Sequence, residues 1–231
     1  MQLLRTPHGI ARARRHAIVA AAGAWSALAA GAGAPPADAS QWTFRVLLDG
    51  APIGEHRFSA TPSADGLERT LLSEATFAVR WLGVTLYRYQ HRAVERWRGD
   101  CLVTLAADTD DNGQRTRVTA ALRGDLFEVS APAPQNARGC VMSFAYWNPA
   151  LRSQQRLLNS QTGRIEPVRI TPIGAATLDL GERAVDATGW RIAGLPQPID
   201  VWYSPQGDWI GLDTRVDGGR LLSYRRLPSP P

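Results

Sequence analysis

The chain has 231 residues, a formal net charge of +5 and two cysteines, and all 26 of its basic residues are arginine. Because a Schiff base and the phosphate-binding P-loop both need lysine, the absence of lysine excludes these two chemistries. Residues 40–231 have a length that suits one domain with a substantial core.

Residues 1–39 have the pattern of a cleaved signal peptide. A segment with three arginines precedes a mildly apolar, alanine-rich run over residues 17–34, and Ala37-Asp38-Ala39 fits the small-x-small cleavage site. We therefore expect a mature protein that begins near Ser40 and lies in the periplasm. The glycines that interrupt the apolar run argue against a retained membrane anchor. The Arg14-Arg15 pair suits either the general secretory route or a twin-arginine route.

The expected leader carries more than half of the net charge. Residues 40–231 contain 22 basic and 20 acidic side chains. Nucleic-acid binding needs a clustered basic surplus, and little surplus remains. We therefore expect no nucleic-acid partner.

Apolar and polar side chains alternate with period two along most of the chain, which predicts β-strands. Asp49-Gly50 predicts the turn of a first hairpin. The residues expected on the buried faces of the first strands are Trp42, Phe44, Val46 and Leu48, then His56, Phe58 and Ala60, then Leu71, Ala75, Phe77, Val79 and Trp81, and later Thr116, Val118, Ala120 and Leu122.

The strand over residues 87–97 carries the strongest site signal. Arginines at positions 88, 92, 96 and 98 share one face with Gln90, and arginine is rarely buried unpaired, so this face is expected to meet water. The opposite face is expected to line the interior and to offer polar groups inside an apolar pocket. Its candidate ligand-binding residues are Tyr87, Tyr89, His91, Glu95 and Trp97. The alternative is purely structural: a hydrogen-bonded buried histidine, and a glutamate paired with an arginine.

The stretch Asp108–Gly113 resembles the start of a calcium loop, because Asp108, Asp110, Asn112 and Gly113 match its first ligand positions. The loop then needs a glutamate at its twelfth position, where this chain has Thr119. Asp-Asn-Gly also favours a β-turn by itself. We expect the turn, and a weak calcium site is the alternative.

Residues 139–164 are expected to form a strand, a short capped helix and a glycine exit. In the strand, one set of side chains would alternate with the other: Cys140, Met142, Phe144 and Tyr146 with Val141, Ser143, Ala145 and Trp147. Asn148 is a favoured N-cap, and Pro149 occupies a first-turn position that helices accept. Leu151 and Leu158 would share one helical face, and Gly163 would end the helix.

Cys101 and Cys140 are expected to form a disulfide, because a cysteine pair in an exported protein usually bridges. The alternative is a reactive Cys140 thiolate beside a histidine. Only His56 and His91 lie beyond the leader, so a histidine-rich zinc site is not expected. We also expect no cofactor.

The C-terminal part predicts two hairpins, with strands at 199–203, 209–216 and 221–227 and turns at Pro205-Gln206-Gly207 and Asp217-Gly218-Gly219. In total, about ten strands at hairpin spacing and one short helix predict a mainly β domain. The expected architecture is an antiparallel meander, either an open curved sheet or a barrel.

Five blocks of the chain carry a family resemblance: "LDGAPIGEHRF", "DTDDNG", "GCVMSFAYWNP", "LLNSQTG" and "VWYSPQGDWIGLDT". Together they resemble a family of exported proteobacterial proteins of unknown function, over nearly the whole chain beyond the leader. The resemblance implies the exported compartment and a β-rich fold. It supplies no catalytic residues.

Three functions follow as hypotheses. The first is non-enzymatic binding of an apolar or amphipathic small molecule, such as a lipid, inside the curved sheet. The second is an envelope enzyme that uses His91, Glu95 and Cys140. The third is a structural or interaction protein whose outward arginine row meets an anionic partner. An enclosed cavity holding His91 and Glu95 together would favour the first two, and a solid core would favour the third.

Overall fold

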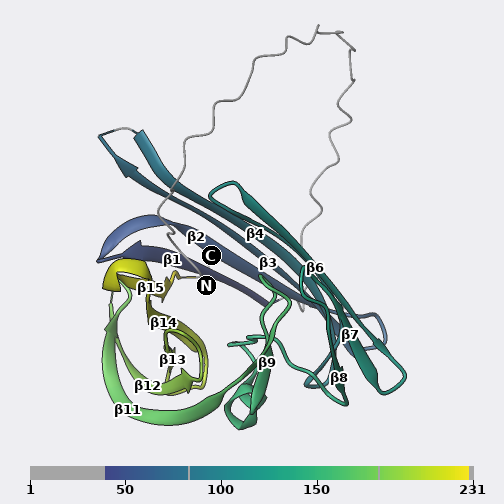
Figure 1. The fold of residues 1–231 in the computed structure, drawn as a ribbon. Helices are drawn as coiled ribbons and strands as arrows, with labels where there is room; N and C mark the ends of the chain where they lie inside the picture. Colours follow the sequence, from purple (N-terminus) through teal and green to yellow (C-terminus); the bar gives the residue numbers. More distant parts are fainter. Residues whose placement is uncertain (1–39, 83, 182, 229–231) are drawn as a thin grey trace, which may run out of the picture.

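A computed structural model describes residues 40–82, 84–181 and 183–228. Thirteen antiparallel strands form one continuous, strongly curved sheet, and two short strands form a second (Figure 1). The expected mainly β class is therefore confirmed, although the strands outnumber the ten expected. The expected leader, residues 1–39, lies outside the described residues.

The first eight strands form a consecutive meander. They are β1 (Ser40–Leu48), β2 (Ala51–Pro62), β3 (Glu68–Trp81), β4 (Val84–Arg98), β5 (Cys101–Asp111), β6 (Gln114–Arg123), β7 (Leu126–Ser130) and β8 (Gln135–Arg138). A second meander follows: β11 (Arg169–Asp179), β12 (Ala184–Ala193), β13 (Ile199–Tyr203), β14 (Trp209–Arg215) and β15 (Leu221–Arg226). The three C-terminal strands and the turn at Asp49-Gly50 confirm the predicted hairpins.

The two meanders join through the first and last strands of the chain. β1 pairs antiparallel with β15, from Phe44 opposite Arg226 to Leu48 opposite Leu222. The two edges of the large sheet are therefore β8 and β11. In Figure 1 the long strands β2–β6 form a slanted wall, and β11–β14 curl beneath β1 and β2.

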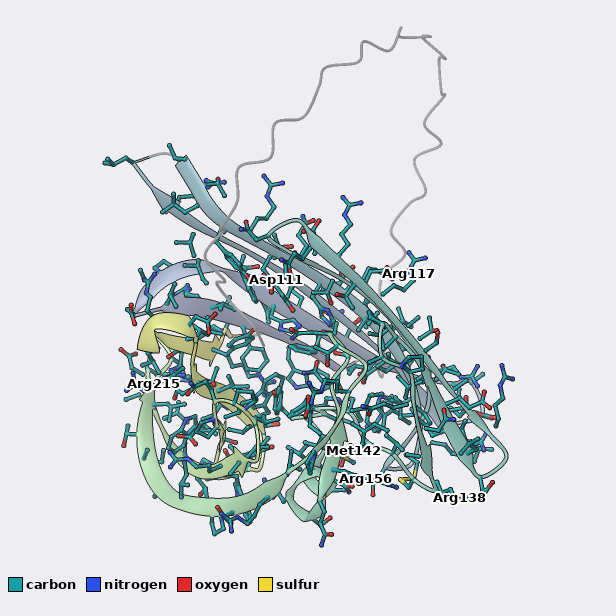
Figure 2. The ribbon with its side chains drawn as sticks, in the orientation of Figure 1. Asp111, Arg117, Arg138, Met142, Arg156 and Arg215 are labelled. Atoms are coloured by element: carbon teal, nitrogen blue, oxygen red, sulfur yellow. A yellow bond between two sulfur atoms is a disulfide. The ribbon has the colours of Figure 1, made fainter. Side chains whose placement is uncertain are left out.

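The concave side of the sheet is filled by the segment that links β8 to β11. This crossover segment (residues 139–168) contains the short strands β9 (Arg156–Leu158) and β10 (Ile165–Pro167). Its Val141, Met142, Leu151, Leu157 and Leu158 are buried in the same cluster as the inward residues of the large sheet. Figure 2 shows Met142 inside the space that the sheet encloses, with Arg117 on its outer side.

The expected strand and helix in this segment are wrong in part. Residues 140–147 form turns and one bridge at Ser143, not a strand, and the helix is a single 3-10 turn, η1 (Pro149–Ser153). A second 3-10 turn, η2 (Asp217–Gly219), lies between β14 and β15. The alternation over 140–147 instead reflects a segment that packs on a sheet through backbone hydrogen bonds, such as Leu102 N–H to the Val141 carbonyl (2.8 Å).

The local signals inside the crossover segment are nevertheless correct. The Asn148 side chain caps η1 by accepting from Ala150 N–H (2.9 Å), and its amide also donates to Asp100 (3.0 Å). Gly163 has φ +73°, and a Cβ there would lie 2.3 Å from the Ala131 Cβ. Only glycine therefore fits at the turn that brings the segment back across the sheet.

The expected disulfide is confirmed. Cys101 and Cys140 are bonded, with their Cα atoms 5.1 Å apart, so the start of the crossover segment is tied to the start of β5. Among the described residues, no helix has the length and apolar character needed to cross a membrane.

We predict that replacing both cysteines by serine lowers the free energy of unfolding by about 3–4 kcal/mol, because the bridge closes a loop of 39 residues in the unfolded chain. Chemical unfolding of the oxidised protein and of the Cys101→Ser/Cys140→Ser variant measures the difference. Two titratable thiols in the oxidised, denatured wild type would contradict the bridge.

Candidate functional site

The predicted two faces of β4 are confirmed. Tyr87, Tyr89, His91, Glu95 and Trp97 are all at most 6% exposed. The arginines at 88, 92, 96 and 98 are exposed on the other face. From Tyr89 to Trp97 the strand lies between β3 and β5, whereas Tyr87 is paired only with β3.

The first three inward residues lie together near one end of the strand. The Tyr87 hydroxyl donates to Asp111 at 2.6 Å, and the Tyr89 and His91 rings lie 6.4 Å apart, nearly parallel. Burial raises the pKa of Tyr87, and its hydrogen bond to Asp111 acts in the same direction. Both tyrosines are therefore neutral phenols throughout the physiological range.

His91 is held by two hydroxyl groups. Its Nδ1 lies 2.9 Å from Thr109 Oγ1, and its Nε2 lies 3.5 Å from Ser160 Oγ, which the crossover segment supplies. Burial lowers the pKa of His91 to about 4, against a smaller opposing effect of Asp108. The ring is therefore neutral at pH 7 and able to donate one hydrogen bond and accept another.

Tyr89 and His91 belong to a connected set of rings on the concave side, which we call the aromatic cluster. It joins both meanders and the crossover segment, through contacts such as Phe44–Trp209 (4.1 Å), Phe77–Tyr89 (5.2 Å) and Tyr146–Trp209 (5.1 Å) between ring centroids. Its members are Phe44, His56, Phe58, Phe77, Tyr89, His91, Phe144, Tyr146, Trp209 and Tyr224.

Part of the aromatic cluster reaches the surface. Phe58, Phe144 and Tyr146 are only half-buried, although they pack against the buried core. His56 stacks on Phe58 with ring centroids 4.0 Å apart and bonds Ser73 through Nε2 (2.7 Å). Its buried Nδ1 has no hydrogen-bond partner among the described residues. The rings of Phe58, Phe144 and Tyr146 are therefore less completely buried than those of Phe44, Phe77 and Tyr89 of the same cluster.

Glu95 and Trp97 form a second, separate group. The Trp97 indole N–H donates to Glu95 Oε2 at 3.0 Å, and Ser143 of the crossover segment also hydrogen-bonds this carboxyl group. Trp97 packs edge-on against Trp147, with centroids 5.4 Å apart. Burial raises the pKa of Glu95 to about 7, and the two hydrogen bonds only partly offset this. The expected pairing with an arginine is wrong, because no ion pair of Glu95 is present in the described part of the chain.

The structure does not bring His91 and Glu95 to a common site. Their hydrogen-bond partners are different: Thr109 and Ser160 for the histidine, Trp97 and Ser143 for the glutamate. Cys140 is in the disulfide, so no Cys–His thiolate pair exists. The Ser160–His91 contact resembles a nucleophile–base pair, but it is long, and the group that orients the ring is a hydroxyl rather than a carboxylate.

The outward arginines are largely neutralised by acids on adjacent strands. Arg92 pairs with Glu74, Arg117 with Asp108, and Arg115 with Asp110, all within 3.2 Å. Arg96 and Arg98 share Glu68. The first three pairs, but not those of Glu68, line a polar groove of about 1090 Å³ across β2–β6 on the outer face. The outer face is thus an alternating ladder of charges rather than a basic patch.

The Asp108–Gly113 stretch contains the end of β5 and the β5–β6 hairpin turn at Asn112-Gly113, so the expected turn is present. Asn112 and Gly113 adopt positive φ angles of 53° and 92°, and Asp110 accepts a hydrogen bond from Gly113 N–H (2.7 Å). That bond, followed by Arg115, lowers the pKa of Asp110. Asp108 and Asp110 are both engaged by arginines, which leaves a calcium site here without support. No cluster of three or more potential metal ligands occurs in residues 40–82, 84–181 and 183–228.

Comparison with known proteins places the chain in a family. The model of the domain of unknown function DUF6134 matches residues 44–227. The chain belongs to the DUF6134 family. This agrees with the resemblance found in the sequence. No curated protein matches the chain.

The fold has a relative among solved structures. A crystal structure of a β-barrel-like protein of the domain of unknown function DUF1849 from Brucella abortus superposes with a TM-score of 0.56 at 11% identity. The match covers 81% of this chain and 94% of the Brucella chain. At this identity the likeness concerns the fold alone.

The aromatic cluster was only partly predictable. Phe44, His56 and Phe58 were expected to face inward. Nothing local indicated that Trp209 and Tyr224 would contact them, because that contact depends on the pairing of β1 with β15. Ser160, expected in a helix, lies instead in the turn between β9 and β10. Its contact with His91 joins residues 69 positions apart, for which no local pattern exists.

We predict that Tyr89→Ala lowers the free energy of unfolding by about 3–5 kcal/mol, because it removes a large aromatic ring that is 2% exposed and leaves a cavity. Arg92→Ala on the outer face should change it by less than about 0.5 kcal/mol, because its ion pair with Glu74 is exposed. Urea unfolding of both variants compares the two faces directly. Equal losses would contradict the assignment of the concave and outer faces.

We predict that Glu95 destabilises the folded protein as pH rises from about 4.5 to about 7. The folded carboxyl has the raised pKa of about 7, so in this window the folded state binds more protons than the unfolded state. The contribution of Glu95 should lower the free energy of unfolding by about 3 kcal/mol above pH 7, relative to acidic pH. The lowered pKa of His91 acts in the opposite direction between about pH 4 and 6.5.

The effect of Glu95 is therefore measured as a difference. Unfolding free energies of wild type and Glu95→Gln are compared at pH 4.5, 6 and 8. The free energy of unfolding of Glu95→Gln should rise steadily relative to that of the wild type as pH rises. A constant difference across this range would show that the folded protein does not raise the pKa of this carboxyl group.

Proposed function

We propose that the protein is an exported, periplasmic binding protein that holds an apolar or amphipathic small molecule, such as a lipid, against the aromatic cluster. The observation that carries this proposal is the half-buried state of Phe58, Phe144 and Tyr146 on the concave side. Rings that could be buried by more chain are instead left partly in water, beside the neutral polar groups of Tyr89, His91 and His56. Apolar walls with a few polar anchors are the usual composition of a small-molecule site.

The polar groups near these rings suit an amphipathic ligand with a neutral or hydrogen-bonding head. His56 offers its unpartnered Nδ1, and the Ser160 hydroxyl lies beside the His91 ring. Both imidazoles are neutral, because burial lowers the pKa of each. The inner tyrosines are also uncharged, so the site carries little net charge near its rings.

The other two functions have less support. An enzyme using His91, Glu95 and Cys140 would need these groups at one centre, and they occupy three different environments. An anionic partner on the outward arginine row would have to compete with Glu68, Glu74, Asp108 and Asp110, which already neutralise it. The contiguous buried core supports a structural role for Glu95 and Trp97. It does not account for the incomplete burial of Phe58, Phe144 and Tyr146.

The test compares ligand binding by two variants. Titration of the wild type with a fluorescent fatty acid should show saturable binding, and mass spectrometry should find lipid in organic extracts of protein purified from the exported fraction. Phe58→Ser should weaken binding about tenfold or more, because it removes a half-buried ring from the site.

Leu67→Ser is the matched control. Leu67 is 69% exposed in the β2–β3 turn, away from the aromatic cluster, and its replacement should leave the affinity unchanged. Absence of saturable binding in the wild type, together with extracts free of small molecules, would contradict the proposal. Equal effects of both substitutions would place the probe elsewhere on the protein.

A further inference from the structure

The β3–β4 hairpin projects beyond the rest of the sheet. Pairing of β2 with β3 ends at Gly54 opposite Phe77, and pairing of β4 with β5 ends at Tyr89 opposite Asp111. The pairs Ala78–Arg88 and Val79–Tyr87 still contact the body of the protein, because Asn112 N–H donates to the Arg88 carbonyl (2.8 Å) and Tyr87 is buried. The pairs Arg80–Thr85 and Trp81–Val84 lie beyond them and have no third strand on either side. Figure 1 shows this end of the hairpin standing clear of the neighbouring strands. At about 3.3 Å per residue, the two residue steps beyond Val79 make a projection of about 7 Å before the turn.

The end of this hairpin is apolar and exposed. Leu82 is 81% exposed, Val84 is 60% exposed and Leu86 is 57% exposed. These are three of the five large apolar side chains that are exposed in the described part of the chain, and they fall within five residues of each other. Two strands without further support are marginally stable in water, so an apolar two-stranded projection indicates a surface that a partner covers.

The two charged side chains on the projecting end are both positive, and the nearest acids, Asp110 and Asp111, lie at the end of β5. Arg80 and Arg88 are exposed on the two strands, and neither forms an ion pair among the described residues. The sequence contains no acidic residue between Glu74 and Glu95. This differs from the outer face further along the same strands, where Arg92 and Arg96 are each paired with an acid.

We infer that the projecting β3–β4 hairpin inserts Leu82, Val84 and Leu86 into the surface of an anionic lipid bilayer, with Arg80 and Arg88 against the lipid headgroups. Interfacial segments bury apolar side chains about 5–10 Å deep, which the projection can reach, and basic residues at that depth are attracted to anionic lipid. A protein partner fits less well, because a stable interface buries about 800 Å² on each side, and the exposed large apolar side chains described at this narrow tip are Leu82, Val84 and Leu86.

The inference concerns a surface separate from the aromatic cluster, and it stands or falls without the proposed ligand. It also specifies which part of the molecule would approach a membrane. The convex projection, rather than the wall of paired charges on β2–β6, would make that contact.

The test is flotation of the protein, residues 40–231, with vesicles. We expect wild type to float with vesicles of phosphatidylglycerol and phosphatidylethanolamine and to float much less with phosphatidylcholine alone. Leu82→Asp should lower partitioning into the anionic vesicles about tenfold, because a charge enters the headgroup boundary in place of a leucine. Leu67→Asp, at a comparably exposed leucine beyond the other end of β3, should change it less than about twofold.

Two further measurements make the outcome decisive. Arg80→Ala/Arg88→Ala should weaken partitioning into anionic vesicles and make it less sensitive to salt. Unfolding midpoints of all variants should match the wild type, because the substituted side chains are exposed. Failure of the wild type to float, or equal losses in Leu82→Asp and Leu67→Asp, would overturn the inference. So would a dimer in light scattering that Leu82→Asp dissociates, since the tip would then serve self-association.

Discussion

The structure depends on how the crossover segment covers the concave side of the sheet. A thirteen-stranded sheet with free edges at β8 and β11 would leave its inward apolar residues in water unless something filled the curve. The chain from β8 to β11 does this, and it is attached to both meanders. The Cys101–Cys140 disulfide and the Leu102–Val141 hydrogen bond attach it to β5. The Tyr203 hydroxyl, which donates to the Tyr146 carbonyl at 2.9 Å, attaches it to β13.

The same segment determines the chemistry of the inward face of β4. It supplies Ser143 to Glu95 and Ser160 to His91, so each buried polar group of the strand has a hydroxyl partner from across the concave side. An unpartnered buried polar group destabilises a fold, and a hydroxyl satisfies one without adding charge. Burial, rather than these bonds, keeps both groups largely uncharged between about pH 4 and 7, because it raises the pKa of Glu95 to about 7 and lowers that of His91 to about 4. The crossover segment also separates them, because Ser143 and Ser160 lie on different parts of the segment.

The alternation of side chains was enough to predict β4, its two faces and the C-terminal hairpins, because a period of two is a local property of a strand. The capping role of Asn148 and the turn at Asp49-Gly50 were local as well. The conformation of residues 140–147 was not predictable in this way. Its alternation has the period of a strand, but the residues pack across a sheet instead of extending it. The composition of the aromatic cluster was also hidden, because it requires β1 to pair with β15 at the other end of the chain.

Charge divides the molecule into surfaces with different capacities for binding. On β2–β6 the outward arginines alternate with acids on neighbouring strands, and such pairs satisfy one another without attracting a charged partner from a distance. Beyond Phe77 and Tyr89 the ladder stops, because the strands that carried the acids have ended and β3 and β4 continue alone. Arg80 and Arg88 therefore have no ion-pair partner among the described residues, at the place where the apolar side chains are most exposed. Because β3 and β4 extend beyond their pairing with β2 and β5, the surface changes from paired charges on the sheet to a basic and apolar end of the hairpin.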